Sequence, residues 1–216
     1  MRKILEIGGG RTPYFIRYNI SLSTEDSYQA IDLDEENIEL AKSSIKKYQE
    51  KGNICPADLS FTFGDASEMY LPLNNFDEIV ISNTISAPIH KSWDRDGNVL
   101  KITKEGKTTE RPIKEKENTE DPFYIERKKM ISEAINSLKS GGMLSVYTDL
   151  IIYGIHSYER ILEELKNDQT LMYQNDKTEA LRIDEINVKK IASGEFCCCF
   201  RAEVLPKSEV HRFVKI

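Results

Sequence analysis

The sequence has few of the residue types that bind metals or form disulfide bonds. It contains three histidines and four cysteines in 216 residues, and three of the cysteines are consecutive, at 197–199. Consecutive residues of a strand point to opposite faces, so these thiols cannot converge on one metal ion. The spacings typical of zinc sites are also missing. We therefore expect no metal site. The cysteines are expected to be small buried side chains of a β-strand, and free thiols of this kind suit a reducing cytoplasm.

Long apolar runs and a surplus of basic residues are missing too. No apolar run approaches the roughly 20 residues that span a bilayer. Glu6 interrupts the apolar run nearest the N-terminus, whereas a signal peptide has a longer uninterrupted one. The formal net charge of −6 disfavours a nucleic-acid partner. We expect a single domain over residues 1–216, cytoplasmic and without a membrane anchor.

Strand-like and helix-like segments alternate along residues 1–150, which predicts an α/β fold with a doubly wound, mostly parallel sheet and helices on both faces. Expected strands cover 4–7, 28–31, 59–63, 76–81 and 143–148, and expected helices cover 35–48, 122–139 and 158–166, with Gly141-Gly142 ending the second helix. The tail predicts two further strands, 181–188 and 195–204, as an antiparallel hairpin.

Residues 86–121 interrupt this alternation. They are charged, mixed in sign and poor in apolar periodicity. Residues 99–102 and 108–113 flank Gly106, which predicts an exposed hairpin. Because so few apolar residues cannot build a separate core, we interpret the segment as an insertion within the domain.

The first strand is followed by Gly8-Gly9-Gly10, two residues after Glu6. Glycines let a ligand approach the backbone closely, because side chains there would collide with it. We expect the N–H groups at the start of the next helix to receive polar or anionic ligand groups. Taken alone, the turn is also compatible with a tight strand-to-helix connection that binds nothing.

Acidic residues follow the next two strands, at the edge where open parallel sheets bind ligands. Asp32 ends the second strand, and its carboxylate suits a pair of vicinal ribose hydroxyls. Asp34 competes for that role, but its position before Glu35 favours a helix cap. After the third strand, Asp65 suits an adenine amino group and Ala66 leaves space for the ring; Asp65 also suits the cap of a short helix near residues 68–69.

These segments resemble the class I S-adenosylmethionine-dependent methyltransferases. The matching residues are ILEIGGG at 4–10, YQAIDLDEENIELAK at 28–42, FTFGDASEMYLPLNNFDEIVISNTI at 61–85 and LKSGGMLSVYTD at 138–149. The resemblance implies a Rossmann-like, seven-stranded sheet whose last strand is antiparallel. It also implies S-adenosyl-L-methionine as the cofactor and S-adenosyl-L-homocysteine as the product.

The family's site residues carry over onto matching positions. There the glycine loop contacts the amino-acid part of the cofactor and the acid matching Glu6 helps fix the loop. The acid matching Asp32 binds the ribose, and the acid matching Asp65 binds the adenine amine. The expected cofactor-binding set is Glu6, Gly8, Gly9, Gly10, Asp32, Leu33, Asp65, Ala66 and Ser82.

Two departures from the family pattern concern the loop and the chain's start. Arg11-Thr12-Pro13 follows Gly10 where a further small residue is common, although Pro13 suits the first turn of a helix. The sequence begins at the first strand, without the helices that cover the substrate in many relatives. We expect the insertion at 86–121 to replace them as a lid.

Candidate catalytic residues lie after the fourth and fifth strands. The fourth ends in Ser82-Asn83-Thr84-Ile85 and lacks the Asn/Asp-Pro-Pro-aromatic tetrad of the family's amino-group methyltransferases, so a base or glutamine amide is not indicated as acceptor. Asn83 is a candidate for orienting the substrate, and His90 and His156 for a general base; a lone histidine is more often structural. Trp93, Tyr124 and Tyr153 either line an acceptor pocket or serve ordinary packing.

The sequence thus predicts methyl transfer to a small-molecule or peptide acceptor. Three alternatives stay open: a non-catalytic adenosylmethionine-binding interaction protein, an aminopropyltransferase and an NAD-dependent oxidoreductase. The aminopropyltransferase needs more acidic residues for a polyamine than Asp149 alone. The oxidoreductase predicts Gly at position 13, where this chain has Pro, and leaves Asp65 unexplained.

Overall fold

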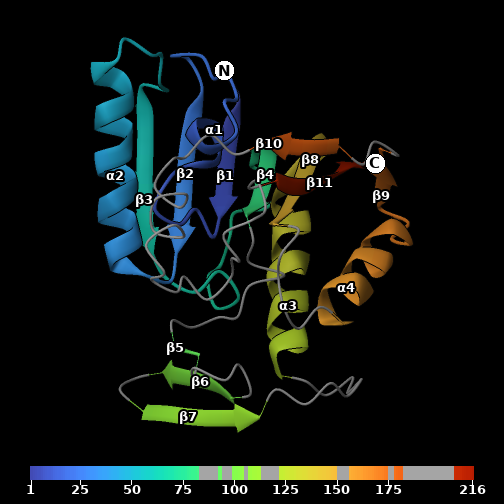
Figure 1. The fold of residues 1–216 in the computed structure, drawn as a ribbon. Helices are drawn as coiled ribbons and strands as arrows, with labels where there is room; N and C mark the ends of the chain where they lie inside the picture. Colours follow the sequence, from blue (N-terminus) through green and yellow to red (C-terminus); the bar gives the residue numbers. More distant parts are fainter. Residues whose placement is uncertain are drawn as a thin grey trace.

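The computed structural model describes residues 1–82, 92–93, 99–104, 107–112, 122–149, 156–174, 178–181 and 207–216, and it confirms the alternation of strands and helices (Figure 1). The helices are α1 (Tyr14–Arg17), α2 (Glu35–Glu50), α3 (Pro122–Ser137) and α4 (His156–Lys166). The strands are β1 (Lys3–Ile7), β2 (Ser27–Asp32), β3 (Asp58–Phe63), β4 (Phe76–Ser82), β5 (Ser92–Trp93), β6 (Val99–Lys104), β7 (Lys107–Pro112), β8 (Leu138–Asp149), β9 (Leu171–Tyr173), β10 (Thr178–Leu181) and β11 (Lys207–Lys215).

The main sheet follows the order β10-β11-β8-β4-β1-β2-β3, and β9 also pairs with β11. The pairs from β8 to β3 are all parallel. In contrast, β11 runs antiparallel to β8, β9 and β10. The expected path of seven strands, mostly parallel and with an antiparallel last strand, is therefore confirmed, and β9 adds an eighth strand to the sheet.

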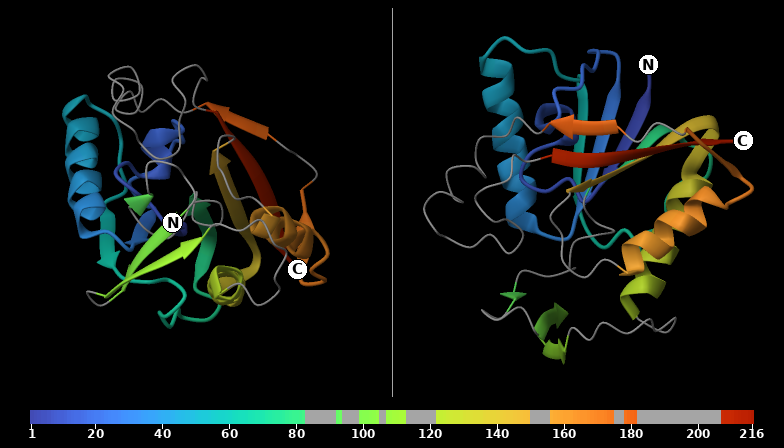
Figure 2. Two further views of the ribbon diagram at one scale, coloured as in Figure 1. Left: turned by 60° about the horizontal axis from the view of Figure 1, so that its bottom comes forward. Right: turned by 45° about the vertical axis from the view of Figure 1, so that its right-hand side comes forward.

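Alternate residues of the central strands enter two cores on opposite faces of the sheet. On β1, Ile4 packs with α1 and α2 in one core, whereas Leu5 and Ile7 pack with α3 and α4 in the other. Figure 2 shows the same division, with α2 on one side of the strands and α3 and α4 on the other. The sheet is therefore covered on both faces, as a doubly wound fold requires.

The boundary between α3 and β8 differs from the prediction that the helix continues to residue 139. The helix ends at Ser137, and the next residue, Leu138, is fully buried and already pairs with Phe76 of β4. The glycines instead form an irregularity within β8: Gly141 has φ +77°, and a Cβ on Gly142 would lie 2.8 Å from the Lys139 carbonyl oxygen. Burial of Leu138 against the sheet ends the helix before the glycines do.

The tail contains strands that its sequence pattern did not predict. Strands β9 and β11 were both missed, and β10 meets the predicted strand at Leu181 alone. Most of the predicted hairpin at 181–188 and 195–204 lies outside the described residues. In β11, Val210, His211 and Phe213 are all buried, so the strand lacks the simple alternation that reveals strands in sequences.

The segment expected to form a hairpin does so. Strands β6 and β7 pair antiparallel, from Val99↔Pro112 to Lys104↔Lys107, and β5 adds a third strand. Figure 1 draws this small sheet beyond the ends toward which β1 and β2 point. No helix in the described part of the chain is long and apolar enough to cross a membrane.

The cysteine prediction is tested only at Cys55, because 197–199 lie outside the described residues. Cys55 is buried, as expected, but it belongs to the connection between α2 and β3 and not to a strand. Burial raises the pKa of its thiol.

A buried carboxylate, Asp26, joins the starts of β1 and β2. It accepts hydrogen bonds from the Arg2 backbone N–H at 3.0 Å, Arg2 Nη2 at 2.8 Å and the Ser23 backbone N–H at 2.9 Å. The Asp26 side chain is 4% exposed. The hydrogen bonds from Arg2 hold the pKa of Asp26 well below its ordinary value.

We expect Asp26→Asn to lower the free energy of unfolding by about 2 kcal/mol near neutral pH, because it weakens charge-assisted hydrogen bonds. Since the folded-state pKa is depressed, this contribution is complete above about pH 5 and is lost progressively as the pH falls through the folded-state value. Urea denaturation over that range measures both effects. Asp58→Asn is the control, because Asp58 is exposed; equal losses in the two variants would contradict the prediction.

Candidate functional site

The ends of four adjacent parallel strands bring the predicted site residues together. Ile7 at the end of β1 pairs with Ile31 and with Ile81, which precede Asp32 and Ser82 at the ends of β2 and β4. Asp32 itself pairs with Phe63, two residues before Asp65. The glycine loop, Asp32 and Asp65 therefore share one edge of the sheet, as predicted for a ligand site.

The glycine loop, residues 8–12, turns sharply after β1. Gly8 has φ +77° and Gly10 has φ +58°, a region in which other residues are strained. A Cβ added at Gly9 would make ordinary contacts, at 3.5 Å from Ala30 Cβ and Glu6 Cδ. The backbone therefore needs glycine at positions 8 and 10 and not at position 9.

Glu6 is fully buried and receives three hydrogen bonds from three different elements. Its Oε2 accepts from the Tyr14 backbone N–H at 2.9 Å and from the Tyr28 hydroxyl, and its Oε1 accepts from the Ser82 hydroxyl at 2.8 Å. Burial raises the pKa of Tyr28 well above its ordinary value, and the Glu6 carboxylate raises it further, so the hydroxyl stays protonated and donates. Glu6 thus joins α1, β2 and β4 at the base of the loop.

Most N–H groups at the start of the next helix, which were expected to receive a ligand, are engaged within the protein. Pro13 has no N–H, and the N–H of Tyr14 already donates to Glu6. Helix α1 is also short, ending at Arg17. The Ile16 N–H donates to the Pro13 carbonyl oxygen, so the start of α1 offers few N–H groups to a diphosphate.

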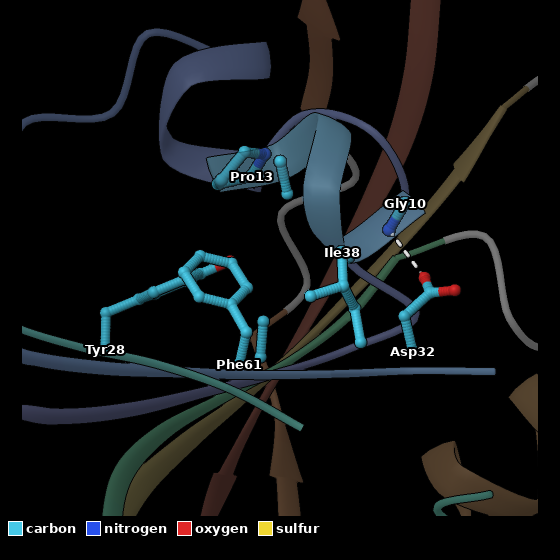
Figure 3. A pocket seen from close by; sticks show the side chains of 9 residues that line it. Gly10, Pro13, Tyr28, Asp32, Ile38 and Phe61 are labelled. Carbon is cyan, nitrogen blue, oxygen red and sulfur yellow. Dashed lines mark hydrogen bonds between the residues drawn. The ribbon is translucent and has the colours of Figure 1, made fainter. Parts of the chain in front are cut away.

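Asp32 faces the loop and is held on both oxygens. Its Oδ2 accepts from the Gly10 N–H at 2.8 Å (Figure 3), and its Oδ1 accepts from the Asp34 N–H at 2.9 Å and Asn37 Nδ2 at 3.2 Å. Asp34 instead accepts from the Glu36 N–H at 3.0 Å and caps α2. The prediction that Asp34 is the helix cap is confirmed, and Asp32 is the carboxylate beside the loop. Leu33, between them, is exposed.

The two residues expected near adenine are engaged locally. Asp65 Oδ1 accepts from the Ser67 N–H at 2.8 Å and the Ser67 hydroxyl at 2.7 Å, while its carbonyl accepts from the Glu68 and Met69 N–H groups. This is the capping role that the sequence left open, here at a turn. Ala66 is buried in the core that Ile31 also lines, so its methyl group packs inward.

A small hollow lies beneath the loop, between α2 and strands β2 and β3. Its lining consists of Gly9, Gly10, Pro13, Tyr28, Ala30, Asp32, Ile38, Ala41 and Phe61. Figure 3 shows Tyr28, Phe61 and Ile38 around it, with Asp32 at its rim directed toward Gly10. It has space for roughly one water molecule, so it does not hold a nucleoside.

The candidates for catalysis lie mostly outside the described residues. Asn83, His90 and Tyr153 are not described, and His156 and Trp93 are placed only in the backbone of α4 and β5. Tyr124 is described: its hydroxyl donates to Glu164 of α4, and the Arg160 guanidinium lies 4.4 Å from the centre of its ring. Tyr124 therefore packs between α3 and α4, which is the ordinary packing role considered for it.

Sequence reasoning missed Arg17, the last residue of α1. Its guanidinium is buried, and Nη2 donates to the carbonyl oxygens of Gly9 at 2.5 Å and Thr12 at 2.6 Å. An arginine seven residues after the glycines carries no signal in a sequence, because the approach of its side chain to the loop depends on the turn of α1.

No protein-family model matches the chain, and no curated protein sequence matches it. Solved structures do match its fold. The N-methyltransferase NodS from Bradyrhizobium japonicum WM9, in complex with S-adenosyl-L-homocysteine, matches with a TM-score of 0.55 and 12% identity, over 99% of this chain and 78% of that one. The [4+2]-cyclase SpnF matches with a TM-score of 0.54 and 13% identity, over 99% and 75%.

TrmN from Thermus thermophilus matches over 100% of this chain with a TM-score of 0.50 and 12% identity. This chain spans 44% of TrmN, less than half of that protein's length. At such identities a likeness establishes the fold, and the fold here is that of the class I methyltransferases. It does not by itself establish a reaction, since one of these neighbours is called a cyclase.

We expect Glu6→Gln to lower the free energy of unfolding by about 3 kcal/mol. The NH2 group of the glutamine cannot accept a hydrogen bond, so at least one of the three buried donors around position 6 loses its acceptor. Ser82→Ala is the matched comparison. It removes one hydroxyl donor and leaves the Glu6 carboxylate able to accept from the other two, so it should lower the free energy of unfolding by only about 1 kcal/mol. Denaturant unfolding at neutral pH measures both, and a smaller loss in Glu6→Gln than in Ser82→Ala would contradict the role given to Glu6.

Proposed function

We propose that the chain binds S-adenosyl-L-methionine at the edge formed by the glycine loop, Asp32 and Asp65. The observation that carries the proposal is the Gly10 N–H donating to Asp32, which places the three glycines of the loop directly beside a carboxylate at the edge where open parallel sheets bind ligands. Leu33 lies exposed next to Asp32 and offers an apolar surface to the adenine ring.

The residues present fit this cofactor. A carboxylate has about four lone-pair positions, and Asp32 has three hydrogen bonds from the protein, so one further hydroxyl can bind without a rearrangement. A second ribose hydroxyl takes the place of one present donor. If that donor is Gly10, its N–H becomes available to the ligand. Binding of the ribose to Asp32 then frees a hydrogen-bond donor of the loop for the rest of the cofactor.

We further propose that the bound cofactor donates its methyl group to a small-molecule or peptide acceptor. The sulfonium group supplies an activated methyl, and the protein's part is to hold an acceptor lone pair in line with it. Asn83, His90 and His156 remain the candidates for orienting the acceptor or removing its proton. The net charge of −6 favours such acceptors over nucleic acids.

The other functions have less support. A dinucleotide needs N–H groups at a helix start for its diphosphate, and here Pro13 has none and the Tyr14 N–H is taken by Glu6. An aminopropyltransferase needs several carboxylates for a polyamine, whereas the end of β8 supplies Asp149 alone. A non-catalytic protein that binds the cofactor is the remaining alternative, and turnover distinguishes it.

We expect calorimetry to detect S-adenosyl-L-homocysteine binding and Asp32→Asn to weaken it at least tenfold, since the carboxylate's charge-assisted hydrogen bonds are lost. Asp34→Asn is the matched control, because Asp34 caps α2 two residues away and should leave the affinity within about twofold. NAD should raise the melting temperature less than S-adenosyl-L-homocysteine does. Unchanged affinity in Asp32→Asn would refute the site.

We also expect the protein to transfer labelled methyl groups from S-adenosyl-L-methionine to a component of small-molecule or peptide pools, with Asp32→Asn inactive at limiting cofactor. Radiolabel in a product separated from the cofactor measures the transfer. Tight cofactor binding without turnover across broad pools would favour the non-catalytic alternative.

A further inference from the structure

Arg17 and Asp32 hold one peptide unit of the glycine loop from opposite sides. Arg17 Nη2 donates to the Gly9 carbonyl oxygen at 2.5 Å, and the next N–H, that of Gly10, donates to Asp32 Oδ2 at 2.8 Å. In a planar trans peptide the C=O and the following N–H point in opposite directions. The guanidinium and the carboxylate therefore fix the orientation of the Gly9–Gly10 peptide jointly.

The Arg17 side chain is built into the loop. It is 4% exposed, and the same Nη2 atom also donates to the Thr12 carbonyl oxygen at 2.6 Å. A Cβ on Gly10 would lie 3.4 Å from Nη2, so the guanidinium occupies the space directly beside this glycine. The side chain thereby bridges the loop from residue 9 to residue 12 and brings a permanent positive charge to its backbone.

We propose that Arg17 is the positioning residue for the amino-acid part of the cofactor, an inference that rests on the proposed function. When a ribose hydroxyl takes the place of the Gly10 N–H on Asp32, the carboxylate no longer holds the loop at Gly10. Arg17 then keeps the Gly9 carbonyl turned inward and the Gly10 N–H turned toward the ligand. Its charge also favours a carboxylate at the loop, which belongs to the amino-acid part and not to the adenosine part.

The test compares two ligands that share adenosine. S-adenosyl-L-homocysteine carries the amino and carboxyl groups, and 5′-methylthioadenosine lacks both. We expect Arg17→Gln to weaken S-adenosyl-L-homocysteine about tenfold, the effect of losing hydrogen bonds from a charged donor, and 5′-methylthioadenosine by less than about twofold. Calorimetry on the full chain gives both dissociation constants and their ratio, which a general loss of stability does not change.

Two further variants complete the experiment. Arg2→Gln alters an arginine at the opposite edge of the sheet, where it binds Asp26, and should leave the ratio unchanged. Arg17→Lys keeps the charge on a shorter side chain that cannot reach both carbonyls, and its ratio should lie between those of the wild type and Arg17→Gln. If Arg17→Gln does not fold, the Arg17→Lys variant provides the test. A ratio of the two dissociation constants equal to that of the wild type in Arg17→Lys then overturns the proposal.

The remaining outcomes separate the two proposals. A wild-type protein that binds neither ligand overturns the proposed function and this inference with it. A wild-type protein that binds both, with Arg17→Gln weakening both equally or neither, overturns the role of Arg17 and leaves the cofactor site in place.

Discussion

The buried carboxylate of Glu6 is the contact on which the arrangement of the site depends. A carboxylate removed from water must be surrounded by donors, and Glu6 obtains them from three elements: the Tyr14 N–H of α1, Tyr28 of β2 and Ser82 of β4. Each donor is thereby fixed relative to the end of β1. The glycine loop leaves β1 immediately afterwards, so both its start and its exit are anchored to the same side chain.

A second set of charges holds the middle of the loop. Arg17 binds carbonyl oxygens on one side of it, and Asp32 binds an N–H on the other. The positive φ of Gly8 and Gly10 makes this tight path possible, and the hydrogen bonds from the charged side chains select it. The protein's own side chains therefore organise the loop backbone in advance, which reduces the entropy lost on binding the proposed cofactor.

Local patterns in the sequence predicted much of the fold. The helix 35–48 was evident from Asp34 as its cap, its acidic first turn and its buried stripe of Ile38, Ala41 and Ile45. The glycine turn and the placement of Asp32 and Asp65 after strands predicted which edge of the sheet carries the candidate site. Where local signals were weak, prediction failed: β9 is only three residues long, and β11 buries consecutive residues.

Residue types and their spacing thus determined by themselves the α/β alternation, the parallel core of the sheet and the chemical character of the predicted site. These features follow from short-range periodicity and from the rule that parallel strand ends share an edge. Tertiary structure alone decided that Leu138 belongs to a strand, that the Tyr14 N–H is taken by Glu6, and that Arg17 braces the glycine loop. Each depends on groups that approach only after the chain has folded, because a buried charge or N–H takes whichever partner the packing brings within hydrogen-bonding distance.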